Sequence, residues 1–268
     1  MGRIYTIANQ KGGVGKTTTT VNLGAYLALL GQRVLLVDLD PQANASSCLG
    51  IDKRTVRNGT YDVIIGETQA IKYILFNPRL KLSLLPSSLA LAGAEVELVP
   101  VIARETRLRN ALQPVISRYD YILIDCPPSL GLLTLNGVVA AKDGVIIPVQ
   151  CEYLALEGIG QLSQTLARIR AAIYPDLKLR GVVLTMFDIR TKLSADVVRE
   201  ITQHFPDQVF HTIIPRSVRL AEAPSYGQPI SVYAPGSNGA MAYSNLAREI
   251  LAGDGVLVPE PISSLVSV

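Results

Sequence analysis

The sequence is poor in aromatic and sulfur-containing residues. Its 268 residues include no tryptophan, 4 phenylalanines and 3 cysteines. We therefore expect a core made mainly of aliphatic side chains. Cys48, Cys126 and Cys151 are too few and too irregularly spaced for a disulfide framework or a zinc site, which indicates buried thiols in a reducing cytosol.

Long hydrophobic runs and an excess of charge of one sign are also missing. No run approaches the roughly 18 apolar residues of a membrane-spanning helix, and we find no signal-peptide pattern, so we expect a cytoplasmic protein. A net charge of +3 allows a nucleic-acid surface only where basic residues cluster locally. A hydrophobic content of 49% with 18% charged residues excludes a disordered chain.

A glycine-rich segment, residues 9–18, lies between two hydrophobic runs. Ile4 to Ala8 is typical of a buried strand, and Thr19 to Leu30 is compatible with a helix. Strand, glycine-rich turn and helix are the order that a phosphate-binding loop requires.

The residue types in this segment fit the same purpose. Gly12, Gly13 and Gly15 let the backbone turn its N–H groups toward an anion at the positive end of a helix dipole. Lys16 can then reach the β- and γ-phosphates, and the Thr17 hydroxyl can coordinate Mg²⁺. The candidate nucleotide-binding residues are Lys11, Gly12, Gly13, Val14, Gly15, Lys16, Thr17 and Thr18.

The loop departs from the standard pattern, because Gln10 stands where G-x-x-x-x-G-K-[ST] requires glycine. A second lysine, Lys11, stands at the loop entry instead, and a solvated loop charge is the alternative interpretation of it. The string KGGVGKTT resembles the deviant Walker A motif of the ParA/MinD superfamily of ATPases. The resemblance implies that Lys11 reaches across an ATP-bound homodimer to the partner's nucleotide, and that Lys11 and Lys16 are catalytic.

Two acids follow the next predicted strand, which runs from Arg33 to Val37. In a βαβ unit Asp38 and Asp40 emerge at the carboxyl edge of a parallel sheet, where a carboxylate can hold Mg²⁺ or orient the attacking water. A turn-forming aspartate before proline is the alternative. The string VDLDPQ resembles the switch I segment of the superfamily, which implies a catalytic and metal-linked role for Asp40 and a supporting one for Asp38.

A third hydrophobic run, Tyr121 to Ile124, ends at Asp125. Hydrophobic residues followed by an acid have the Walker B form, in which the acid holds the Mg²⁺ shell. This pattern is weak alone and gains its meaning from the phosphate loop. The string DCPPS that begins at Asp125 resembles the switch II segment of the superfamily.

The remaining pattern indicates an α/β fold: a single-domain, doubly wound P-loop NTPase with a mostly parallel central sheet flanked by helices. We assign residues 1–251 to the ATPase domain and residues 252–268 to a disordered tail. Further strands are expected at Leu80–Leu85, Gly144–Gln150, Leu179–Met186 and Val209–Ile214. Further helices are expected at Thr60–Gly66, Gln69–Leu75, Leu89–Val99, Glu105–Tyr119, Leu156–Ile173, near residues 192–204 and at Asn238–Leu251.

The segment IPRSVRLAEAPS, residues 214–225, resembles the signature of the ParA/Soj branch of chromosome-partition ATPases. The resemblance implies that Pro215 lies against the adenine. It also implies that Arg190 and Arg219 bind DNA without sequence preference. For a single arginine, a solvated and locally paired side chain is the alternative.

Several functions fit a two-lysine ATP loop. The first is a nucleoid-associated DNA-partition ATPase with a ParB-type partner, and a relative that positions a protein cargo would use the same surfaces. A MinD-like membrane-bound ATPase should end in a basic amphipathic helix, whereas residues 252–268 contain no basic residue. Three unpaired cysteines argue against an electron-transfer relative with an iron–sulfur cluster. A P-loop kinase should carry an acceptor-substrate lid, and no such insertion is visible.

Overall fold

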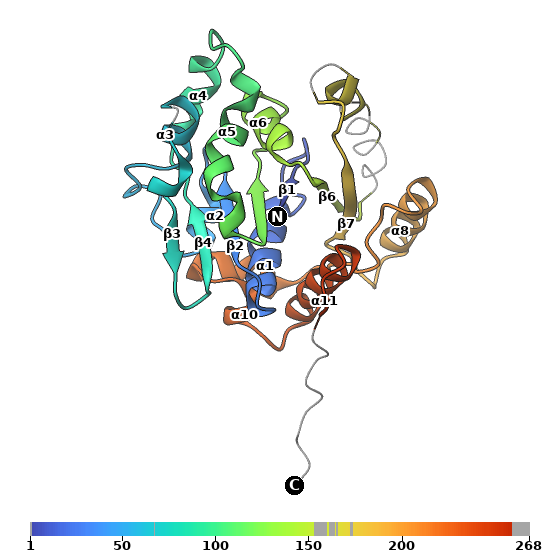
Figure 1. Cartoon of the computed structure of the whole chain (residues 1–268). Coiled ribbons are helices and arrows are strands. Elements are labelled where there is room, and N and C mark those ends of the chain that lie inside the picture. The colour runs from blue at the N-terminus through green and yellow to red at the C-terminus, as the bar shows by residue number, and fades with distance from the viewer. Residues whose placement is uncertain are drawn as a thin grey trace.

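The computed structural model describes residues 2–66, 68–152, 160, 164, 166–171 and 174–258. A seven-stranded sheet, with the order β3-β4-β2-β5-β1-β6-β7, forms its centre (Figure 1). Every neighbouring pair is parallel except β3 and β4 at one edge. The strands are β1 Arg3–Ile7, β2 Val34–Asp38, β3 Leu75–Asn77, β4 Leu82–Leu85, β5 Tyr121–Asp125, β6 Gly144–Gln150 and β7 Leu179–Thr185.

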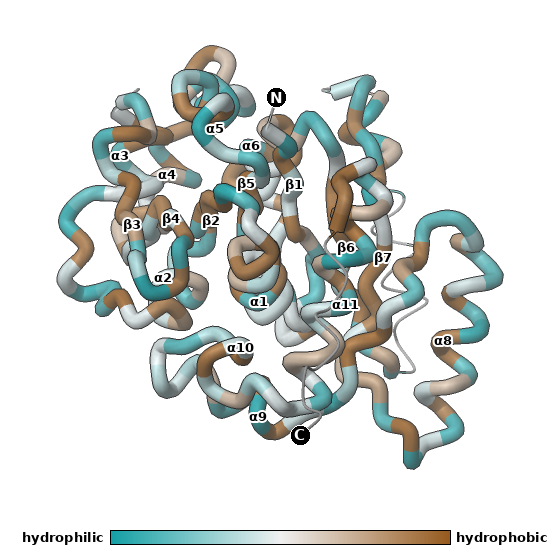
Figure 2. The backbone as a smooth tube through the Cα atoms, turned by 60° about the horizontal axis from the view of Figure 1, so that its bottom comes forward, coloured by the Kyte–Doolittle hydropathy of each residue, from teal (hydrophilic) through white to brown (hydrophobic). Residues whose placement is uncertain are grey.

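Helices cover both faces of the sheet. All five residues of β2 and of β5 are buried, as continuous apolar strands in a doubly covered parallel sheet should be. On one face the core includes residues of α3 (Thr60–Ile65), α4 (Leu91–Glu97), α5 (Arg107–Leu112), α6 (Leu132–Ala140) and α8 (Lys192–His204). On the other it includes residues of α1 (Lys16–Leu29), α2 (Asn44–Cys48), α9 (Val218–Glu222), α10 (Ile230–Tyr233) and α11 (Asn238–Gly253). Figure 2 shows hydrophobic residues along β2, β4 and β7.

The carboxyl ends of three central strands meet at one edge. The strand register pairs Asp125 with Ile7 on one side and with Asp38 on the other. The loops that follow β1, β2 and β5 therefore start level with one another, which confirms the predicted doubly wound architecture and brings the candidate site residues together.

The opposite end of the strands carries a buried polar network around Asp254, just after α11. The Asp254 carboxylate accepts hydrogen bonds from the Tyr5 hydroxyl at 2.8 Å and the Tyr121 hydroxyl at 2.9 Å. Arg180 and Arg3 form ion pairs with it at 3.1 and 3.4 Å, and its side chain is only 3% exposed. The network ties the C-terminal helix to β1, β5 and β7.

The predicted last strand, Val209–Ile214, is not a regular strand. It makes two isolated parallel bridges to the chain beside it, Val182 with Val209 and Phe187 with Pro215. From Val209 to Pro215 the chain advances six residues, whereas the paired segment from Val182 to Phe187 advances five. The Val209–Pro215 segment therefore has one extra residue, which interrupts the ladder as a β-bulge does.

Two further segments that were predicted to be helices also differ from the prediction. The helix expected over Glu105–Tyr119 is divided into the 3-10 turn η2 (Arg104–Thr106), α5, and the 3-10 turn η3 (Gln113–Arg118), because Pro114 has no N–H to continue the α-helical ladder. Gln69–Leu75 contains only the 3-10 turn η1 (Ala70–Lys72), and β3 begins at Leu75. β3 itself was not predicted, since three residues are too few to show a period.

Other expectations fall partly outside the described residues. Of the helix expected over Leu156–Ile173, residues 156–159, 161–163, 165, 172 and 173 are not described. Residues 259–268 of the predicted tail are not described either, so the division at residue 251 stays a prediction; α11 itself ends at Gly253. Within the described residues, no helix is both long and apolar enough to cross a membrane.

Candidate nucleotide-binding site

The loop between β1 and α1 has the backbone of an anion cradle. Gly13 and Gly15 have φ values of +74° and +89°, a region that residues with a Cβ adopt at a cost. Gly15 directly precedes α1, and none of the described side chains caps that helix, nor is there an acid in its first turn. The N–H groups at the start of α1 are therefore available to an anion.

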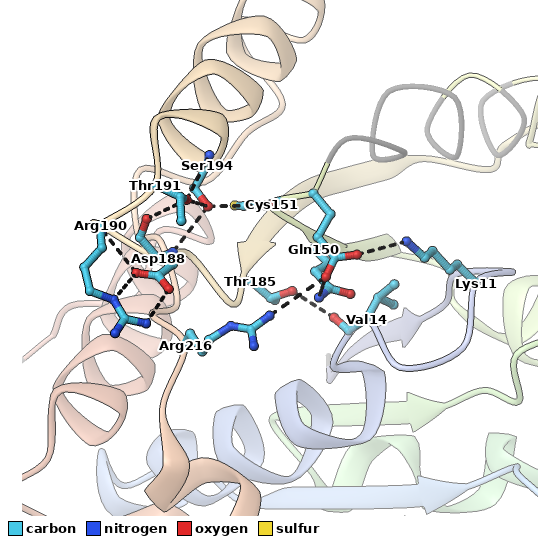
Figure 3. Close-up of polar contacts among 11 residues, drawn as sticks. Lys11, Val14, Gln150, Cys151, Thr185, Asp188, Arg190, Thr191, Ser194 and Arg216 are labelled. Atoms are coloured by element: carbon cyan, nitrogen blue, oxygen red, sulfur yellow. Dashed lines mark hydrogen bonds and ion pairs between the residues drawn. The ribbon is translucent and has the colours of Figure 1, made fainter.

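Three polar contacts fix the loop to the edge of the sheet. The Asn9 side-chain amide donates to the Pro148 carbonyl at 2.8 Å, and its carbonyl oxygen accepts from the Lys11 backbone N–H at 3.0 Å. Farther along, the Thr185 hydroxyl donates to the Val14 carbonyl at 2.9 Å (Figure 3). Strands β6 and β7 thus hold the loop in shape.

The two lysines of the loop lie in different surroundings. Lys16 is 7% exposed, and its ammonium donates to the Lys11 carbonyl at 2.9 Å. Burial lowers the pKa of Lys16, although the nearby Asp125 and Asp40 act in the opposite direction. The Lys11 side chain is 38% exposed, and its ammonium lies 3.6 Å from Glu152.

The Thr17 hydroxyl and the Asp125 carboxyl group are hydrogen-bonded to each other. The Thr17 hydroxyl donates to Asp125 Oδ2 at 2.7 Å, and the Thr20 hydroxyl donates to Oδ1 at 3.0 Å. Asp125 is completely buried, and this burial raises the pKa of its carboxyl group to about 8. Hydroxyl and carboxylate oxygens are the ligands that Mg²⁺ prefers, so the pair fits that ion. Thr20 was not predicted, although its spacing of three residues from Thr17 places both on one helix face.

Asp38 and Asp40 have different environments. Asp38 Oδ2 accepts from the Ser46 backbone N–H at 2.8 Å and from the Ser46 hydroxyl at 2.7 Å, and burial raises the pKa of Asp38 to about 6. Asp40 Oδ1 accepts from the Gln42 N–H at 2.9 Å, and the Ser87 hydroxyl donates to the Asp40 carbonyl at 2.8 Å. Asp38 therefore fixes the loop internally, while Asp40 lies close enough to Lys16 to influence its pKa.

A pocket of about 300 Å³ opens beside the end of the phosphate loop. Pro215 lines it, together with Gly15 and Thr18 from the loop. Arg216 and Tyr243 are further lining residues, and neither was predicted. The pocket brings Pro215 to the phosphate loop although 200 residues separate it from Gly15.

Neither of the two predicted DNA-binding arginines lines this pocket. Arg190 is paired with Asp188, with N–O distances of 2.9 and 2.7 Å, and Arg219 is paired with Glu222 at 3.0 Å. Their side chains are 81% and 61% exposed. Local pairing, the alternative considered for each arginine, is thus present. Both guanidinium groups remain open to solvent.

Comparisons with known proteins find relatives that match almost the whole length of the chain. A family model described as an AAA domain matches residues 2–179. The chain is 54% identical to the sporulation initiation inhibitor protein Soj of Bacillus subtilis, covering 94% of this chain and 99% of the relative. It is 51% identical to the chromosome-partitioning ATPase Soj of Treponema pallidum, covering 95% and 99%. A solved structure named cobyrinic acid a,c-diamide synthase, from Mycobacterium smegmatis with bound ATP analogue and magnesium, has a TM-score of 0.83 and 38% identity, covering 97% and 99%.

Proposed function

Because this chain belongs to the Soj/ParA family of chromosome-partitioning ATPases, we propose that it forms an ATP-dependent homodimer that binds DNA non-specifically and segregates DNA with a ParB-type partner. The observation that carries this proposal is that the two loop lysines differ in burial and in surroundings. The ammonium of Lys16 lies inside the cradle, whereas that of Lys11 lies at its mouth and is accessible to a second molecule.

The residues for ATP binding follow from the site. The backbone from Gly12 to Thr18 receives the phosphates, and Lys16 contacts the β- and γ-phosphates. Thr17 and Asp125, with Asp40, are the groups that would hold Mg²⁺, which neutralises phosphate charge during transfer. Pro215 packs against the base in the adjoining pocket.

Hydrolysis needs a group that orients water and a cation that stabilises the transferred charge. We assign the first role to Asp40, since it lies at the carboxyl edge of the sheet and is not held by Ser46 as Asp38 is. The second role belongs to Lys11 of the opposite subunit together with Lys16 of the same subunit. Loss of the γ-phosphate removes what Lys11 binds, so the dimer separates.

Dimerisation makes DNA binding depend on the nucleotide. Arg190 and Arg219 supply few phosphate contacts in one subunit and twice as many in two. Because log affinity falls with log salt by about 0.9 per phosphate contact, doubling the contacts changes both the affinity and its salt dependence. The protein is then nucleoid-associated only in the ATP state, without stable membrane binding.

A DNA-binding assay with ATP, ADP and no nucleotide tests this function, with anionic liposomes as the control surface. We expect the protein to bind any DNA sequence when ATP is present, but not with ADP or without nucleotide. We expect no binding to liposomes in any of the three conditions. Liposome binding with ATP would favour a MinD-like function instead. A protein cargo on the nucleoid would leave the assay unchanged, so a ParB-type partner is tested separately by its stimulation of hydrolysis.

A further inference from the structure

One carboxylate contacts two cations from different parts of the nucleotide site. Glu152 Oε2 lies 3.6 Å from the Lys11 ammonium, and Oε1 lies 3.9 Å from the Arg216 guanidinium. The Gln150 amide also donates to Oε1. Figure 3 shows Lys11 and Arg216 reaching toward one another from two sides, with Gln150 between them.

The two cations come from different segments of the site. Lys11 is at the entry of the phosphate loop, whereas Arg216 lines the pocket beside Pro215. The side chains of Lys11, Glu152 and Arg216 are 38%, 45% and 59% exposed, and ion pairs of this exposure are weak enough to exchange partners. If one cation leaves, the other still neutralises the carboxylate.

We propose that Glu152 is a positioning residue that holds the Lys11 ammonium within its own subunit until the partner's phosphates displace it. This inference rests on the proposed role of Lys11 in the dimer. Arg216 then remains as a counter-ion of Glu152, so the exchange leaves this acid paired at the edge of β6.

A second contact releases Lys11 at the same time. The Lys16 ammonium donates to the Lys11 carbonyl and thereby fixes the backbone of residue 11. Phosphates in the loop compete for that ammonium, because a charged acceptor is stronger than a carbonyl. Filling the loop therefore frees the Lys11 carbonyl, and the partner's phosphates draw its side chain from Glu152.

The variant Glu152→Gln tests the proposal in the full-length protein. With saturating Mg²⁺ and a non-hydrolysable ATP analogue, sedimentation velocity should show a dimer dissociation constant lower by about 2- to 30-fold, since two pairs open per dimer and each exposed pair is worth a factor of about 1.4 to 5. The gain should shrink as salt rises, because screening already weakens the pair in the wild-type protein. Glu152→Asp should restore wild-type behaviour in part, and Glu200→Gln on α8 is the control for removal of a negative charge.

The variant Arg216→Met should have the opposite effect. Without its competitor, Lys11 pairs more strongly with Glu152, and dimerisation should weaken by about 1.4- to 5-fold per subunit. In a Glu152→Gln background the same substitution should no longer weaken dimerisation at saturating analogue, because the shared carboxylate is gone.

The outcomes separate the two proposals. The role of Glu152 is wrong, and the proposed function stands, if the wild-type protein dimerises with ATP but Glu152→Gln dimerises no more tightly. The same conclusion follows if the tighter dimerisation of Glu152→Gln does not change with salt concentration. If the wild-type protein forms no dimer with ATP, both are wrong.

Discussion

The ammonium of Lys16 donates a hydrogen bond of 2.9 Å to the carbonyl of Lys11, so the two lysines of the phosphate loop are joined through the backbone. A lysine that binds phosphate has to give up this contact. The loop therefore satisfies Lys16 through its own backbone, and a phosphate that draws the Lys16 ammonium away releases the carbonyl of residue 11.

Replacing Lys11 by alanine should abolish ATP-dependent dimerisation while the monomer still binds ATP. The reason is that the Lys16 contact uses the backbone of residue 11, which alanine retains. Light scattering measures the dimer, and fluorescence of a labelled ATP analogue measures the monomer's affinity. Lys72→Ala is the control lysine. An unchanged dimer would remove the role of Lys11 in the partner's site.

Asp40 and Asp38 should differ on substitution. Asp40→Ala should lower ATP turnover by about 10²- to 10⁴-fold, the usual range for a positioned acid or base, and keep the dimer on DNA. Asp38→Ala should lower the melting temperature instead, because the Ser46 N–H and hydroxyl lose their buried acceptor. Turnover assays and thermal melts of both variants check the contrast, and normal turnover in Asp40→Ala contradicts the assignment.

The roles of the arginines can be separated by a matched control. Arg219→Ala should weaken binding to every DNA sequence alike and lower the slope of log affinity against log salt by about 1 for each phosphate that the variant no longer binds. Arg190→Ala should do the same. Arg54 pairs with Asp52 as Arg190 pairs with Asp188, two residues apart, but it belongs to the segment between α2 and α3. Arg54→Ala should therefore leave DNA binding unchanged, and a sequence-dependent loss of affinity in Arg219→Ala would contradict binding to the DNA backbone.

The metal-free protein should lose stability as pH rises from about 4 to 8. The pKa of Asp125 rises from 3.8 to about 8 on folding, so the folded state keeps a proton that the unfolded state has released. The free energy of unfolding then falls with pH by up to about 1.4 kcal/mol per unit. Asp125→Asn should flatten the profile between about pH 6 and 8, above the raised pKa of Asp38, in melts recorded with chelator. A variant that keeps the wild-type slope would show that another group is responsible.

Asp254 should contribute to stability and not to turnover. Asp254→Ala leaves Arg180 and two tyrosine hydroxyls without their buried partner and should lower the free energy of unfolding by about 3 kcal/mol. Asp196→Ala, which breaks an exposed pair with Arg199, should cost about 0.5 kcal/mol or less. Denaturant unfolding measures both, and equal effects would contradict the importance of burial.

The phosphate loop was predictable because its chemistry is local. Glycines, a lysine and a threonine stand in one stretch between a strand and a helix. Asp125 was predictable for a similar reason, because it directly follows an apolar run. Parallel topology then placed these ends at one edge. The interrupted segment at Val209–Ile214 shows the limit, since an extra residue opposite β7 leaves no mark on a hydrophobic pattern.

The residues that sequence reasoning missed act through distant partners. Glu152 follows a strand without any motif, and its meaning depends on Lys11 and Arg216, which are far from it in the chain. Ser46 is a second example, because its role is to donate hydrogen bonds to Asp38 and no sequence motif marks it. Such residues are identified only once folding has assembled their neighbours.

The buried network at Asp254 lies at the amino-terminal ends of the strands, and the Asp125 corner lies at their carboxyl ends. The Asp254 network thus stabilises the fold from the end of the sheet that does not carry the candidate ATP site. A lineage can therefore adapt to a new temperature through substitutions in this network without rebuilding that site.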